Sequence, residues 1–249
     1  MKIPKIYKDK DVDLELIKDK CVAIIGYGNQ GRAQALNLRD SGVDVRIGLR
    51  EESERRVEVG REGFISLSIK EAVENCDIIS LLVPDQVMGE VYKVEIQPYL
   101  QEGQTLLFSH GYNIHYGVIQ PPEFINVVMA APSGAGVELR KRYTDGSGIP
   151  GLFAVHQNPS SDLEKIVLAY CRAIGLTKSG VVKSTFKEET ETDLFGEQII
   201  LIGGIPKLIQ SSYKVLLEAS YSPIAAWFVC YYELKTIVDL FHSKGLAVL

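Results

Sequence analysis

The sequence lacks several features that would assign it to particular classes of protein. Its net charge is −5 over 249 residues, so we expect no basic surface for neutralising nucleic-acid phosphates. No apolar run is long and uncharged enough to cross a bilayer, and the charged segment Met1–Lys10 does not have the pattern of a signal peptide. We therefore expect a cytoplasmic protein that binds neither nucleic acid nor membrane.

Cysteine is scarce and shows no metal-binding or redox pattern. The four cysteines, Cys21, Cys76, Cys171 and Cys230, have no C-x-x-C spacing, and each stands in an apolar stretch. The expected role of all four is that of small buried hydrophobic side chains.

Short apolar runs alternate with amphipathic or turn-rich segments through the first part of the chain. The predicted strands are Cys21–Ile25, Val43–Leu49, Asp77–Val83, Thr105–Ser109, Ile125–Ala131 and Gly151–Val155. This alternation predicts a mostly parallel sheet with helices on both faces. From Thr185 to Lys244 the apolar spacing is helical, so we predict domains at 1–182 and 183–249. Two strongly apolar helices in the second domain predict burial against a subunit partner.

A glycine-rich turn joins the first predicted strand to a helix. Gly26, Gly28 and Gly31 form a G-x-G-x-x-G string in the strand-turn-helix setting of a dinucleotide site. The helix N-terminus would then hold the pyrophosphate, with Tyr27, Gly28, Asn29 and Gln30 as its contacts. The alternative is a glycine-rich turn without a ligand. The predicted fold is therefore α/β: a Rossmann-type doubly wound parallel sheet followed by a short all-α domain.

The end of the second predicted strand indicates which dinucleotide binds. Arg50 stands where an acidic residue would bind a ribose 2′-hydroxyl, and its guanidinium suits a 2′-phosphate instead. Ser53 and Arg55 can add donors, which favours NADP over NAD. Three neighbouring carboxylates would repel the phosphate unless they point outward: Glu51, Glu52 and Glu54.

The third predicted strand ends in a second group of candidate coenzyme contacts. Ligands of open parallel sheets bind beyond the carboxyl ends of the strands. Asp85, Gln86, Val87 and Met88 follow this strand and are therefore candidates. The alternative for Asp85 is a helix N-cap.

Four strings carry a resemblance to a known family: G-Y-G-N-Q-G-R-A-Q-A-L-N-L-R-D-S-G-V-D-V, H-G-Y-N-I-H-Y-G, T-F-K-E-E-T-E-T-D-L-F-G-E-Q and E-L-K-T-I-V-D-L. Together they resemble ketol-acid reductoisomerase from Ile6 to about Leu246. The resemblance implies an NADP- and Mg²⁺-dependent dimeric enzyme of valine and isoleucine synthesis. Such an enzyme isomerises an acetohydroxy acid by alkyl migration and reduces the product with NADPH.

The resemblance also implies roles for individual residues. Asp193 and Glu197 match the family's metal-binding pair, and their i, i+4 spacing places both carboxylates on one helix face. Glu233 matches a metal ligand that the partner subunit contributes. His110 matches the active-site histidine, and Gly136 a coenzyme contact. Without the resemblance, His110 would be a structural histidine, and an ordinary acidic helix start would consist of Glu188, Glu189, Glu191, Asp193 and Glu197.

Three departures from the family pattern concern catalysis. Ser133 stands where the family has a catalytic lysine, and a hydroxyl cannot replace an ammonium as a fixed cation. Val229 replaces the other member of the partner's carboxylate pair. The sequence also stops at Leu249, before the family's substrate-binding serine.

These observations leave three hypotheses. The first is a working ketol-acid reductoisomerase whose substitutions are compensated by other residues or by a separate polypeptide. The second is a non-catalytic relative that binds NADP and dimerises. The third is a reductase of another small 2-keto acid that needs only hydride transfer.

Overall fold

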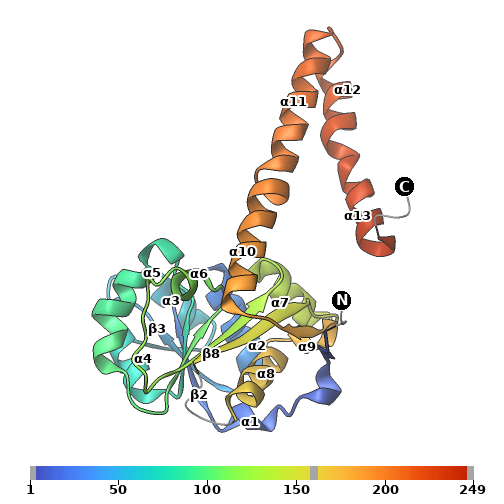
Figure 1. Cartoon of the computed structure of the whole chain (residues 1–249). Coiled ribbons are helices and arrows are strands. Elements are labelled where there is room, and N and C mark those ends of the chain that lie inside the picture. The colour runs from blue at the N-terminus through green and yellow to red at the C-terminus, as the bar shows by residue number, and fades with distance from the viewer. Residues whose placement is uncertain (1–3, 158–161, 246–249) are drawn as a thin grey trace. The chain divides into compact units, whose positions relative to one another are not determined.

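The computed structural model describes residues 4–157 and 162–245, so Leu249 lies outside the described residues (Figure 1). The chain divides into two compact units, Met1–Thr190 and Glu191–Leu249. The division falls inside a continuous helix, α10 (Phe186–Gly196). The boundary that we predict between residues 182 and 183 lies just before this helix.

Unit 1 is built on a nine-stranded sheet with the order β1-β9-β8-β7-β6-β5-β2-β3-β4. All neighbouring strands are parallel except the pairs β7–β8 and β1–β9. The strands are β1 (Ile6–Tyr7), β2 (Cys21–Ile25), β3 (Asp44–Gly48), β4 (Ile65–Leu67), β5 (Ile78–Leu81), β6 (Thr105–Phe108), β7 (Asn126–Pro132), β8 (Gly151–Gln157) and β9 (Val181–Lys183). The sequence did not predict β1, β4 and β9, because strands of two or three residues are too short to show a period.

Helices cover both faces of this sheet (Figure 1). The helices of unit 1 before α10 are α1 (Glu15–Lys18), α2 (Asn29–Asp40), α3 (Arg55–Arg61), α4 (Ile69–Asn75), α5 (Asp85–Val91), α6 (Tyr112–His115), α7 (Gly136–Thr144), α8 (Leu163–Ala173) and α9 (Leu176–Ser179). Shorter helical turns are the 3₁₀ segments η1 (Asp9–Asp11) and η3 (Gln97–Tyr99) and the π segment η2 (Tyr92–Ile96).

Neighbouring residues of one strand supply the cores of the two faces. Ile24 packs with Leu38 of α2 and Tyr170 of α8, whereas Ile25 packs with Val73 of α4 and Phe108 of β6. Alternate side chains of a strand point to opposite faces, so two buried neighbours require cover on both faces. The predicted α/β fold with a doubly covered sheet is confirmed.

The strand order places a topological switch point beside β2. The chain runs from β2 to β3 and β4 on one side, and it returns to β5, β6 and β7 on the other. The carboxyl ends of β2 and β5 therefore diverge into loops that leave room for a ligand between them.

Two of the four cysteines are paired, contrary to our expectation. Cys21 and Cys76 form a disulfide with their Cα atoms 4.7 Å apart, although 55 positions separate them in the sequence. The reason is topological: Cys21 begins β2, and Cys76 lies just before β5, the neighbouring strand. Cys171 is a buried free thiol, as expected, and Cys230 is a half-buried one.

Unit 2 consists of helices joined by short turns in its described part. After the last residues of α10 it contains the π segments η4 (Glu197–Leu201) and η5 (Phe228–Tyr232) and the helices α11 (Gly204–Glu218), α12 (Pro223–Trp227) and α13 (Leu234–Lys244). Among the described residues of this unit only Ala226 is buried. None of the helices in the described part of the chain combines the length and the hydropathy that a bilayer crossing requires.

Candidate functional site

The glycine turn after β2 has the geometry of a phosphate cradle. Gly26 has φ of +98°, a conformation that side-chain-bearing residues rarely adopt, and Gly28 is the N-cap of α2. A Cβ on Gly31 would lie 2.2 Å from the carbonyl oxygen of Gly26, so the helix packs closely against the turn. A Cβ on Gly28 would meet no described atom within 4 Å, which leaves open space in front of this helix start. The turn therefore fits a dinucleotide pyrophosphate.

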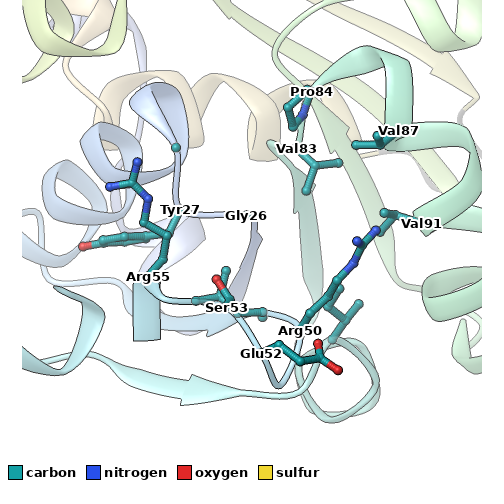
Figure 2. Close-up of a pocket in the computed structure, with 14 residues that line it drawn as sticks. Gly26, Tyr27, Arg50, Glu52, Ser53, Arg55, Val83, Pro84, Val87 and Val91 are labelled. Carbon is teal, nitrogen blue, oxygen red and sulfur yellow. The ribbon is translucent and has the colours of Figure 1, made fainter. Parts of the chain in front are cut away.

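A pocket of about 450 Å³ opens beside this turn (Figure 2). Its walls come from the glycine turn, the loop after β3, the end of β5 and one side of α5. Figure 2 shows the loop with Arg50, Ser53 and Arg55, and across from it Val83 and Val87. An apolar wall opposite a loop rich in hydrogen-bond donors suits an adenosine with a phosphorylated or free ribose.

The predicted coenzyme contacts divide into three groups. Those that line the pocket are Tyr27, Gly28, Arg50, Ser53, Arg55 and Val87. Asn29 and Gly136 line a second hollow of about 320 Å³, which also reaches Tyr27, Gly28 and Arg55. The remaining four line neither space: Gln30, Asp85, Gln86 and Met88. Gln30 donates through Nε2 to the carbonyl oxygen of Gly134, at 2.9 Å, and Met88 is buried.

The three acidic residues after β3 differ in their position relative to the pocket. Glu52 lines the pocket, whereas Glu51 and Glu54 are exposed and are not part of its lining. One carboxylate therefore stays close to the place of a 2′-phosphate, and two of them do not.

A charged cluster holds Tyr27 in the turn. Its hydroxyl donates to Glu62 at 2.5 Å, and Arg32 of α2 donates to the same carboxylate through Nε at 3.0 Å. Burial opposes ionisation of Glu62, but the hydrogen bonds from Arg32 and Tyr27 outweigh it and keep its pKa below the usual range. Burial and the neighbouring Glu62 raise the pKa of the Tyr27 hydroxyl, which therefore stays protonated. Glu62 thus ties the glycine turn to the end of α3.

A second polar group lies beyond the carboxyl end of β6. His110 Nδ1 is 2.8 Å from Glu189 Oε1, and the backbone N–H of Gly111 donates to Glu189 Oε2 at 2.7 Å. Glu189 is only 6% exposed. A Cβ on Gly111 would lie 2.5 Å from the hydroxyl oxygen of Thr190, so only glycine allows this approach of the strand end to α10. A buried carboxylate with two donors fixes the orientation of the histidine ring.

Asp85 belongs to this second group rather than to the pocket. Its Oδ1 accepts a hydrogen bond from Asn113 Nδ2 at 2.8 Å, and Pro84, not Asp85, stands at the N-cap of α5. Burial raises the pKa of the Asp85 carboxyl, although the charge of His110 and the amide of Asn113 oppose this shift.

We predicted no functional role for Glu189, which we named only as part of a possible acidic helix start. The spacing offers a signal that could have found it, since Glu189 precedes Asp193 by four residues on the same helix. Asp193 is exposed, and Glu197, half-buried, follows α10 as the first residue of η4. Carboxylates at this spacing share a helix face and offer the hard oxygen ligands that Mg²⁺ prefers.

The two replaced residues, Ser133 and Val229, are exposed. Ser133 follows β7 at the carboxyl edge of the sheet, and its N–H donates to the carbonyl oxygen of Pro150 at 2.9 Å. Val229, in η5, is 55% exposed, and Glu233 at the start of α13 is exposed too.

Comparisons with known proteins agree with this geometry. The family model for the acetohydroxy acid isomeroreductase NADPH-binding domain matches residues 16–180, and that for the ketol-acid reductoisomerase C-terminal domain matches residues 186–249. A ketol-acid reductoisomerase (NADP(+)) of Methanocaldococcus jannaschii is 52% identical over 97% of this chain and 73% of its own length. The corresponding protein of Methanopyrus kandleri is 50% identical over 98% of this chain and 74% of its own.

Solved structures lead to the same family. An NADH-preferring ketol-acid reductoisomerase from an uncultured archean has a TM-score of 0.93 and 43% identity, covering 98% of this chain and 75% of its own. A semialdehyde dehydrogenase NAD-binding protein from Cupriavidus necator, at 17% identity and a TM-score of 0.71 over 91% of this chain and 84% of its own, shares the fold alone. With both family models matched and half of the residues identical to named relatives, the chain belongs to the ketol-acid reductoisomerase family.

Proposed function

We propose that this protein acts as a ketol-acid reductoisomerase of branched-chain amino-acid biosynthesis. It rearranges an acetohydroxy acid by alkyl migration and then reduces the resulting 2-keto acid with hydride from NADPH. The observation that carries the proposal is that relatives named for this activity match 96% to 98% of the chain at 50% to 52% identity. The pocket beside the glycine turn is the expected place for the adenosine end of the coenzyme.

Asp193 and Glu197 are the residues of this chain that we expect to hold Mg²⁺, together with Glu233 from a second copy. The carboxylates of all three residues are hard oxygen donors. The i, i+4 spacing of Asp193 and Glu197 places these two on one helix face. Bound magnesium would supply positive charge next to the substrate oxygens, on which negative charge develops during the migration. Glu189, one turn before Asp193, is already engaged with His110 and Gly111.

His110 is the proposed acid–base group of the chain. Glu189 holds the ring through Nδ1, so Nε2 is the atom that we expect to exchange a proton with the substrate. Buried Glu189 therefore acts by orienting the His110 ring.

Ser133 limits the first half of the reaction in this proposal. Its hydroxyl offers a hydrogen bond but no fixed positive charge at the sheet edge where the family has a lysine. Hydride transfer to a 2-keto acid requires bound coenzyme, and the pocket proposed for its adenosine end contains neither Ser133 nor Val229. We therefore expect slow isomerisation and faster reduction.

A second candidate is a coenzyme-binding relative that does not isomerise its substrate at all. The observation that favours it is again the pair Ser133 and Val229, because these two replacements fall on expected catalytic positions and not on the glycine turn. Such a protein would still reduce other small 2-keto acids.

An assembly of at least two copies is part of the proposal. What supports it is the exposure of large apolar side chains throughout unit 2, such as Leu208, Ile224 and Tyr232. The partner's Glu233 would complete the proposed set of metal ligands. A small-molecule biosynthetic reaction of this kind is expected in the cytoplasm.

The test is consumption of NADPH by the purified protein with acetolactate and Mg²⁺. The proposal expects slow but metal-dependent turnover that an Asp193→Asn variant loses. Coenzyme binding without any turnover of acetolactate would favour the second candidate. Turnover that persists without Mg²⁺ would contradict the assigned metal ligands.

A further inference from the structure

The cations of the coenzyme pocket are paired with carboxylates that lie outside the loop after β3. Arg50 Nε is 3.4 Å from Glu95 Oε1, and Arg55 Nη1 is 2.8 Å from Glu58 Oε2. Glu52 adds a further carboxylate to the pocket lining. The charge available for a 2′-phosphate is therefore much smaller than the two arginines suggest.

Glu95 lies on η2, the segment that continues the helix of the apolar wall, and not on the loop that carries Arg50. Val87 and Val91 of α5 line the pocket, and η2 continues this helix to Glu95, one turn beyond Val91. Figure 2 shows the Arg50 side chain extending toward Val91. The side chain of Glu95 is 32% exposed and that of Arg50 is 55% exposed, so the carboxylate is the more enclosed partner.

This ion pair affects the two coenzymes differently. A 2′-phosphate that approaches Arg50 carries up to two negative charges, and it must share the guanidinium with Glu95 while being repelled by that carboxylate. A ribose 2′-hydroxyl carries no charge, and it can donate a hydrogen bond. The Glu95 carboxylate therefore weakens binding of NADPH and leaves binding of NADH nearly unchanged.

We propose that Glu95 is a coenzyme-specificity residue that lowers the preference for NADPH by engaging Arg50. The inference rests on the proposed function only in that the pocket takes a nicotinamide dinucleotide. It is consistent with a family that includes an NADH-preferring member of the same fold.

The test is titration of the intact protein with NADPH and with NADH, separately, for the wild type and for Glu95→Gln. The variant should bind NADPH about threefold to tenfold more tightly, and its affinity for NADH should stay within about twofold, as expected for removing one partly exposed charge. Glu90→Gln is the matched control, because Glu90 is exposed on α5 and lies outside the pocket lining. Glu90→Gln changes the net charge of the protein by the same amount as Glu95→Gln. This control should leave both affinities unchanged.

A double variant tests whether Glu95 acts through Arg50. In an Arg50→Gln background the Glu95→Gln change should produce a smaller gain in NADPH affinity than in the wild type. An unchanged ratio of the two affinities in Glu95→Gln, a parallel change in both, or weaker NADPH binding would overturn the inference. Turnover plays no part in these titrations, so a protein that binds both coenzymes but fails to convert acetolactate contradicts the proposed function and not the role of Glu95.

Discussion

The coenzyme end and the reaction end of this protein differ in how completely they keep the residues that their chemistry needs. At the coenzyme end, the glycine turn has the required open space at Gly28 and close packing at Gly31. Among the residues expected to act in the reaction, His110 and Glu189 are in contact, but Ser133 and Val229 stand where the resemblance implies a cation and a carboxylate. The proposed function thus assigns coenzyme binding and chemistry to separate sets of residues, so that one set could change without the other.

Restoring the two replaced positions is the change with the largest expected effect. Ser133→Lys together with Val229→Glu should raise acetolactate turnover by something on the order of 10² to 10⁴, because a charge that stabilises the transition state returns. The measurement is NADPH consumption with saturating Mg²⁺. Ser133→Gln with Val229→Gln is the matched control, with long polar side chains but no charge, and should stay at the wild-type rate. If turnover by the charged double variant stays at the wild-type rate, the two replaced positions do not explain slow isomerisation.

Two glycines of one turn should separate coenzyme binding from folding. Gly28→Ala adds a methyl group that meets no described atom within 4 Å, so its stability should be unchanged, while NADPH affinity falls about 10- to 100-fold. Gly31→Ala places its methyl group 2.2 Å from the Gly26 carbonyl oxygen and should destabilise the fold by about 1 to 3 kcal/mol. Calorimetric titration and thermal unfolding measure the two effects. Equal NADPH affinity in Gly28→Ala and the wild type would show that the pyrophosphate does not bind at this turn.

Glu189 and its neighbour Glu188 provide a matched pair at the reaction end. Glu189→Gln keeps an oxygen acceptor for the Gly111 N–H but removes the charge beside His110, so turnover should fall on the order of tenfold. Glu188 is exposed, and its carboxylate accepts a hydrogen bond from the Ser184 hydroxyl. Glu188→Gln removes the same charge as Glu189→Gln and should change turnover little. The two variants are compared by steady-state kinetics across pH. If both lose activity equally, the role of Glu189 in orienting His110 is wrong.

Removal of one hydroxyl from the glycine turn should have the smallest effect. Tyr27→Phe deletes the hydrogen bond to Glu62 and should lower stability by about 1 kcal/mol at neutral pH. The pKa of Glu62 is lower in the folded protein than in the unfolded chain, where it is about 4.3. Ionised Glu62 therefore stabilises the fold fully above the unfolded-state pKa. This stabilisation is lost as pH falls through the folded-state pKa. The stability difference between the variant and the wild type should therefore narrow as pH falls below the unfolded value. Chemical denaturation at several pH values checks this, and a constant difference would exclude Glu62 as the titrating partner.

Local patterns were enough to predict some parts of the molecule and not others. The position of Gly26, Gly28 and Gly31 between a strand and a helix predicted the turn, because each glycine meets a steric demand of its own neighbourhood. The contacts of Glu62 and Glu95 with cations of the coenzyme site were not predicted. They depend on where α3 and η2 come to lie after the chain has folded, and an isolated glutamate in a sequence shows no sign of this.

The same limit explains the cysteines and Glu189. Cys21 and Cys76 meet because β2 and β5 are neighbours, although β3 and β4 lie between them in the sequence. Glu189 is buried because Gly111 lets α10 approach the end of β6, which the charged string around it did not reveal.

The most direct test of the difference between the two ends compares two substrates in the same preparation. The rate of NADPH oxidation is measured once with acetolactate and once with the isomerised 2-keto acid supplied ready-made, both with Mg²⁺. Slow isomerisation at an intact coenzyme site predicts that the 2-keto acid is reduced at least about tenfold faster than acetolactate is converted. Equal rates with the two substrates, as high as those of a family member with lysine at the position of Ser133, would contradict slow isomerisation.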